Sequence, residues 1–257
     1  MALGAVSQTF LKEIEAVTGL PVHVHCDDQL QAPLLAHVQV ARGGMPFHRV
    51  SYHPSASAMA DFLITFQCAY VLRVYALPPE ERYDLSDTPV AHADSLEWAN
   101  THPASASLPP DRKSAYADFL RTSLMSMIRS IPVGLWIDRD LRERFPSLRH
   151  TQEQAIRRQI DTHALLLRPE YQQSVPAIPL GVNLAVSAAF AKFWGGILGE
   201  SGWMLPYLAA GAMTRGEALL RLMEDIPPSP ANDRRLIQSW ADELGLGAWM
   251  RWTPYRP

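Results

Sequence analysis

Several common catalytic signatures are missing from this 257-residue chain. It contains no GxSxG turn to present a serine nucleophile and no GxxxxGK[ST] or GxGxxG loop to bind phosphates. It also has no CxxC or HExxH spacing to hold a metal ion. The sequence therefore gives no motif support for a hydrolase with a nucleophile elbow, a P-loop enzyme or a dinucleotide-binding enzyme.

An excess of positive charge is also missing. The chain has 23 Lys and Arg against 26 Asp and Glu, a formal net charge of −3. Nucleic-acid-binding proteins neutralise phosphates with clustered basic residues, so the charge balance does not favour a nucleic-acid partner. With 47% hydrophobic and 19% charged residues, the composition is that of a globular protein rather than a disordered one.

Cysteine is scarce, with only Cys26 and Cys68. Both lie among apolar neighbours, where a free buried thiol is ordinary, and we expect no disulfide between them. The first residues lack the basic region of a signal peptide. The longest apolar stretch, residues 180–198, is interrupted by Asn183 and Lys192, which favours a buried helix over a membrane span. We expect a soluble, cytoplasmic protein without membrane contacts.

The first 83 residues predict a small unit of the order α-β-β-β-α. Residues 7–18 form an amphipathic helix with Ser7 as its N-cap, and residues 21–26 alternate as a strand. Residues 33–41 and 47–53 are two further strands, which the turn RGGMP joins into a hairpin.

The remainder predicts a mainly α-helical part, so the expected class is α+β. Residues 84–111, rich in Ser, Ala, Pro and Asp, are predicted to connect the two parts. We expect no long regular element there, apart from a short helix around 95–100. Residues 112–257 form the helical domain, and its first helices are expected over 112–130 and, separately, over 138–145.

Residues 57–76 predict one continuous helix. It contains no proline or glycine, and Phe62, Phe66 and Tyr70 recur on one face. We expect these aromatic side chains to pack against the hairpin and the helix to bind no metal. Truncating Phe66 to alanine should then cost about 3–5 kcal/mol, as aromatic truncations in cores do.

Histidines gather near the start of the chain. His23 and His25 project from the same side of the predicted strand, a geometry that suits metal ligation. If a metal binds, His23 and His25 with His48 or His53 are the expected ligands. The simpler interpretation is a solvated strand face, and no cofactor is predicted. A Cys–His catalytic dyad with Cys26 or Cys68 is a minor alternative.

Two further groups are candidates for partner contacts. Arginines that could contact phosphate or nucleic acid, interleaved with acidic residues, are Arg139, Arg142, Arg149, Arg157 and Arg158. The C-terminal GAWMRWTPYRP combines Trp, Tyr and Arg, the residue types that anchor interfaces. Its candidate partner-binding residues are Trp249, Arg251, Trp252 and Tyr255, although packing onto their own domain is the alternative.

The order of elements over residues 7–76, with FQCAY on the long helix, resembles the start of the ImmA/IrrE-type zincin-like metallopeptidases. In that family this helix carries HExxH. The resemblance places Phe66 and Tyr70 at the two histidine ligands and Gln67 at the catalytic glutamate. Phenylalanine has no lone pair, and glutamine cannot take up a proton at neutral pH. The resemblance therefore implies a degenerate scaffold that is inactive as a protease.

These observations favour a non-catalytic regulatory or assembly protein that binds a macromolecular partner, most plainly another protein. Two alternatives stay open. One is a metal-dependent hydrolase that uses the N-terminal histidines. The other is a nucleic-acid adaptor that uses the arginines between residues 139 and 158.

Overall fold

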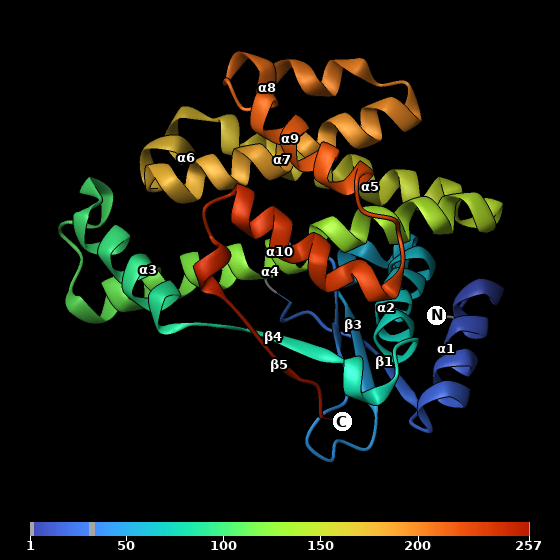
Figure 1. Cartoon of the computed structure of the whole chain (residues 1–257). Helices are drawn as coiled ribbons and strands as arrows, with labels where there is room; N and C mark the ends of the chain where they lie inside the picture. The colour runs from blue at the N-terminus through green and yellow to red at the C-terminus, as the bar shows by residue number, and fades with distance from the viewer. Residues whose placement is uncertain (1–2, 31–33, 257) are drawn as a thin grey trace. The chain divides into compact units, whose positions relative to one another are not determined.

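The computed structural model describes residues 3–30 and 34–256 and confirms the α+β class (Figure 1). Helices dominate it, with one three-stranded and one two-stranded sheet. The chain divides into two compact units. Unit 1 comprises Met1–Asp84, Trp136–Arg158 and Pro254–Pro257, and unit 2 comprises Leu85–Leu135 and Gln159–Thr253.

The N-terminal part of unit 1 has the predicted α-β-β-β-α order. Its elements are α1 (Ala5–Thr18), β1 (Val22–Cys26), β2 (Ala36–Gln39), β3 (His48–Tyr52), the 3₁₀ turn η1 (Pro54–Met59) and α2 (Ala60–Tyr75). Strands β2 and β3 are antiparallel, which confirms the predicted hairpin. Strand β1 pairs with β3 in parallel, so the sheet order is β1-β3-β2. Pro33, the first residue of the second predicted strand, lies outside the described residues.

Helices α1 and α2 cover one face of this sheet. Helix α2 contacts β2, β3 and α1, and Figure 1 shows it beside β1 and β3. Val50 is fully buried on the covered face, and the ring of His48 meets the ring of Tyr75 from α2 edge-on, with centroids 5.6 Å apart. The alternation of the strands therefore places one set of side chains in the core and leaves the other set on the opposite face.

The start of α1 differs from the prediction. The helix begins at Ala5 with Gly4 as N-cap, and Ser7 lies inside its first turn, fully buried. The Ser7 hydroxyl donates to the carboxylate of Asp61 on α2 and to the carbonyl of Gly4. Ser7 therefore links two helices instead of capping one. Helix α1 ends at Gly19, whose φ of 70° suits a residue without a side chain.

Four elements include residues of both units. They are β4 (Tyr83–Asp87), α4 (Pro110–Arg144), α5 (Arg149–Ala164) and β5 (Met250–Pro254), and β4 and β5 form the two-stranded sheet. The two helices expected over 112–130 and 138–145 are one continuous helix, so their separation was a wrong prediction. Pro132 lies inside α4, where proline removes a backbone hydrogen bond. Burial of the neighbouring Val133 and Leu135 offsets that cost.

Unit 2 is mainly helical. Its remaining helices are α3 (Pro89–Thr101), α6 (Pro169–Ser174), α7 (Ala177–Leu198), α8 (Leu205–Ala209), α9 (Met213–Glu224) and α10 (Asp233–Glu243). The most buried apolar helix of unit 2, α7, contacts α8 and α9. Gly216 lets α9 approach α7 closely, since a Cβ there would lie 2.8 Å from the Cβ of Ala188 and 2.9 Å from the backbone nitrogen of Ala189. The small residues of α7 thus permit close packing between these helices.

The expectation that residues 86–110 lack long regular elements was wrong. Helix α3 occupies Pro89–Thr101. The hydroxyl of Thr88 accepts from the backbone nitrogen of Ala91 at 3.4 Å, and Pro89 occupies the first turn, which are standard signals for a helix start. The buried face is made of small residues, Ala91, Ser95 and Ala99, so the segment lacks the large apolar side chains that mark most amphipathic helices.

Neither cysteine is in a disulfide, as predicted. Burial was expected for both, but only Cys68 is buried and Cys26 is exposed, because Cys26 is the last residue of β1. Two helical stretches, Pro54–Tyr75 and Ala177–Leu198, have the length and composition of membrane spans. In the folded chain 50% and 61% of their most apolar windows are buried. Length and composition alone do not distinguish a span from the core helix of a soluble protein.

Candidate partner-binding surfaces

Helix α2, where the resemblance places a degenerate catalytic motif, carries a ladder of aromatic rings. Phe66 lies with its ring centroid 5.9 Å from that of Phe62 and 5.4 Å from that of Tyr70. Phe62 is buried, but Phe66 and Tyr70 are only half-buried. The other buried residues of α2 are Ala60, Leu63, Ile64, Thr65, Cys68, Val71 and Tyr75. All three aromatic side chains were predicted to pack against the hairpin, but only Phe62 is buried, so full packing is wrong for Phe66 and Tyr70.

Gln67 serves a structural contact. Its side-chain nitrogen Nε2 donates to the backbone oxygen of Ala36 on β2 at 3.4 Å. This bond ties α2 to the edge of the hairpin. An amide in this place can donate to a carbonyl, which an ionised glutamate could not do.

The four conditional metal ligands do not converge. His23 and His25 are exposed on β1, whereas His48 is fully buried on the other face of the sheet. The Nδ1 atom of His48 accepts from the backbone nitrogen of Ala41 at 3.0 Å, and its Nε2 lies 3.3 Å from the hydroxyl of Thr18. Burial lowers the pKa of His48, which keeps the ring neutral. His53 accepts from the backbone nitrogen of Ser55, so it caps the turn η1.

Across residues 3–30 and 34–256, no three His, Cys, Asp or Glu side chains gather closely enough to hold a metal ion. The buried thiol of Cys68 has a pKa raised to about 12 by burial. A thiol with such a pKa stays protonated at neutral pH and is a poor nucleophile. His48 and His53 therefore make structural hydrogen bonds, His23 and His25 lie on the other face of the sheet from His48, and the Cys68 thiol is protonated.

The C-terminal residues split between core and surface. Trp249 is 1% exposed, its ring stacks on Trp98 at 5.1 Å, and its Nε1 donates to Asp94 at 2.8 Å. Tyr255 is also buried, within unit 1. These two large side chains fill cores because aromatic rings lose the most exposed area there, and they present no surface to a partner.

The other two tail residues stay accessible. Arg251 is exposed and its Nε donates to the hydroxyl of Ser86 at 3.2 Å. Trp252 is half-buried, and its Nε1 donates to Gln238 at 2.9 Å. Any contact of the tail with a partner therefore falls to Arg251 and the exposed part of Trp252.

Most of the candidate phosphate-binding arginines are engaged locally within unit 1. Arg149 donates to the carbonyl of Arg142, Arg157 pairs with Glu153 at 2.9 Å, and Arg158 donates to Ser55. Such contacts with the chain's own carbonyls and carboxylates compete with phosphate binding. Arg139 is half-buried.

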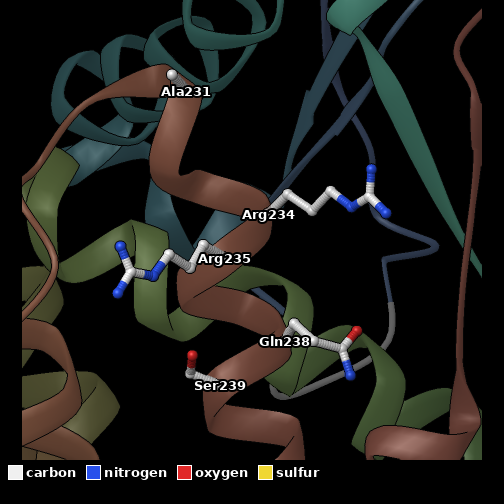
Figure 2. Close-up of a pocket in the computed structure, with 5 residues that line it drawn as sticks. All are labelled: Ala231, Arg234, Arg235, Gln238 and Ser239. Atoms are coloured by element: carbon white, nitrogen blue, oxygen red, sulfur yellow. The ribbon is translucent and has the colours of Figure 1, made fainter.

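A shallow depression of about 310 Å³ lies along α10 and is lined by Ala231, Arg234, Arg235, Gln238 and Ser239. Figure 2 shows that the side chains of Arg234 and Arg235 point to opposite sides of the helix. The guanidinium group of Arg234 lies 5.5 Å from the ring centroid of Trp252. Two diverging arginines do not form the convergent clamp that a phosphate requires.

Among the described residues, the most exposed large apolar side chains lie on the short helix α8. Leu205 and Leu208 are each 63% exposed and lie one helical turn apart. Ile197, at the end of α7, is 38% exposed, and α7 contacts α8 directly. We call Leu205 and Leu208 the α8 surface. This surface was not predicted from the sequence, although one signal is present there: Glu200 is the only charged residue between Phe193 and Thr214.

Two glycines with positive φ flank α8, and one buried tyrosine anchors it. Gly199 ends α7 with a φ of 73°, and Gly211 follows α8 with a φ of 71°, a region that favours glycine. Between them the side chain of Tyr207 is 1% exposed and anchors the helix. Burial raises the pKa of the Tyr207 hydroxyl to about 12. With Tyr207 turned inward, Leu205 and Leu208 are left on the outside.

Comparisons with protein-family models, with curated proteins and with solved structures each find no match to this chain.

Proposed function

We propose that the protein is a non-catalytic binding protein that docks another protein on the α8 surface. The observation that carries this proposal is the exposure of Leu205 and Leu208 in a segment with a single charged residue. Contiguous exposed apolar side chains with few charges are typical of the centres of protein interfaces. Covering one leucine side chain contributes about 1.5–3 kcal/mol, so the pair can provide much of the affinity of a specific contact.

Two further observations support a binding role. Phe66 of α2 has no lone pair to offer a metal, and Gln67 of the same helix is bonded to the backbone of β2. The histidines proposed as metal ligands lie on opposite faces of the sheet or cap a turn. Gln67 and the four histidines therefore make structural contacts or face solvent instead of forming a metal site.

The test is capture of the partner by cross-linking from a lysate of the native source, with a photo-reactive residue at Ala209. The double variant Leu205→Asp/Leu208→Asp should lose at least tenfold of the captured partner, because two buried carboxylates would be unpaired in the interface. Phe119→Asp is the matched control, since Phe119 is 60% exposed on α4 of the same unit.

Circular dichroism of both variants checks that the fold is kept. Capture of the same partner in equal amount by the parent and the Leu205→Asp/Leu208→Asp variant would overturn the proposal. Equal loss in the Phe119→Asp control would do so as well, because the effect would then not belong to the α8 surface.

A further inference from the structure

On the open face of the β1-β3-β2 sheet in unit 1, the strands contribute one formally charged side chain, Arg49. Strand register puts His23, Arg49 and Gln39 in one row across the three strands, and His25, Ser51 and His37 in the row two residues along. Residues paired across neighbouring strands project to the same side of a sheet. These six side chains therefore share the face opposite α1 and α2, and we call it the histidine face.

The histidine face is accessible. All of its members except Ser51, which is buried at the centre, are exposed. The three strands contain no aspartate or glutamate, so no carboxylate within them offsets Arg49. Arg49 forms no ion pair with any residue among 3–30 and 34–256. An exposed guanidinium group without a counter-charge is available to a ligand.

Phe47 orders the cationic side of this face. The ring of His23 stacks on the ring of Phe47 with centroids 4.1 Å apart, and the guanidinium carbon of Arg49 lies 5.5 Å from the same ring centroid. Both side chains thus contact the same aromatic ring, which restricts their conformations before a ligand binds. The conformational entropy that they lose on binding is therefore smaller. An arginine donates two parallel hydrogen bonds to a carboxylate, and a histidine ring adds a further N–H donor.

We propose that the histidine face binds an acidic segment of a partner protein through carboxylates that meet Arg49, His23 and His25. The argument is charge complementarity: the six side chains of this face offer N–H donors and the guanidinium group of Arg49, and none of the six is a carboxylate. A single-stranded nucleic acid is less suited, because Arg49 is the one arginine of the face and the chain as a whole carries a net charge of −3. This proposal is independent of the α8 surface, which belongs to unit 2.

The probe is a fluorescein-labelled decaglutamate peptide, titrated with the full chain at low salt in the presence of EDTA. Fluorescence anisotropy should show saturable binding that weakens as salt is added. Arg49→Gln should raise the Kd about tenfold, and His25→Gln should raise it about threefold. Arg144→Gln, which removes the same charge at an exposed position elsewhere in unit 1, should change the Kd less than twofold.

Three results would overturn this proposal. The first is the absence of saturable decaglutamate binding. The second is an equal effect of Arg49→Gln and Arg144→Gln, which would mean that diffuse charge governs the binding. The third is tighter binding of a labelled 20-nucleotide oligo-dT than of decaglutamate, which would assign the face to nucleic acid. Circular dichroism confirms that both arginine variants are folded.

Discussion

The hydroxyl groups of Tyr75 and Tyr255 lie 3.2 Å apart in the core of unit 1, although 180 positions separate them along the chain. The Tyr255 hydroxyl also donates to the carbonyl of Ala41, and the Tyr255 backbone nitrogen donates to the carbonyl of Arg82 at 2.9 Å. Tyr255 therefore joins the core that residues 41–82 form. Burial raises the pKa of the Tyr255 hydroxyl well above its usual range, which keeps it a donor.

Replacing Tyr255 by phenylalanine should lower the free energy of unfolding by about 1–3 kcal/mol. The ring would still fill its place, but the Ala41 carbonyl would lose the Tyr255 hydroxyl as its donor and the Tyr75 hydroxyl would lose a partner. Urea unfolding of the parent and the variant measures the difference. Trp252→Phe, which removes one half-buried bond to Gln238, should cost less. Equal stability of Tyr255→Phe and the parent would contradict the structural role of the C-terminal residues.

The aromatic ladder of α2 gives a second prediction. Phe62 is 3% exposed, so Phe62→Ala should cost about 3–5 kcal/mol, whereas the half-buried Phe66 should cost clearly less when truncated. The half-buried position of Phe66 therefore corrects the expectation that Phe66→Ala lowers the free energy of unfolding as much as truncation of a core residue does. Thermal unfolding of both variants beside the parent decides it. A larger loss for Phe66→Ala than for Phe62→Ala would show that the burial of α2 has been wrongly assigned.

A buried carboxyl group makes unit 1 sensitive to pH. Burial raises the pKa of Asp138 to about 8, although Gln152 donates to its carboxylate. In the unfolded chain the same group loses its proton near its ordinary pKa of about 3.9. As pH rises from about 4 to 8, the unfolded state is ionised while the folded group stays protonated. The free energy of unfolding should therefore fall by up to about 1.4 kcal/mol per pH unit in that window.

Asp138→Asn removes this titration and leaves a neutral side chain of similar size. The variant and the parent should have similar stability near pH 4, and the variant should be the more stable of the two at pH 8. Melting temperatures across that range give the comparison, with the exposed Asp140→Asn as control. A stability difference between Asp138→Asn and the parent that does not change with pH would mean that Asp138 is ionised in the fold.

The contact of α7 with α9 offers a paired test in unit 2. Gly216→Ala should destabilise by about 1–3 kcal/mol, because its Cβ would lie 2.8 Å from Ala188 and 2.9 Å from the backbone of Ala189. Gly196→Ala on α7 meets nothing within 4 Å and should stabilise by up to about 1 kcal/mol through helix propensity. Opposite shifts in melting temperature are expected. Destabilisation of equal size at both positions would exclude close packing as the cause.

The sequence predicted elements that rest on local patterns. Alternating side chains and the RGGMP turn were sufficient for the β2-β3 hairpin, and the apolar spacing was sufficient for most of α1 and α2. The continuous helix predicted over 57–76 begins only at Ala60, because residues 57–59 belong to the 3₁₀ turn η1. Features decided by distant contacts could not be predicted in this way. Ser7 follows the usual N-cap composition, but its hydroxyl bonds to Asp61 on another helix. Pro132 is ordinarily a helix breaker, but the burial of its neighbours keeps α4 continuous.

The candidate site was harder to predict than the fold. Alternation correctly put His23 and His25 on one side of β1, but His48 faces the core because the pairing register of β1 with β3 sets its side. Register is a tertiary property, so the sequence could not show that Arg49 and His37 share the face of His23 and His25. The composition of the tail suggested an interface, whereas Trp249 and Tyr255 are core residues.

The proposal of a binding protein without metal chemistry is tested most directly by elemental analysis of the protein purified without a histidine tag from cells grown with zinc. The account predicts far less than one zinc, iron or manganese ion per chain, and the same metal content in the parent and in a His23→Ala/His25→Ala variant. One zinc ion per chain in the parent, lost in that variant, would contradict it and would favour a metal-dependent hydrolase.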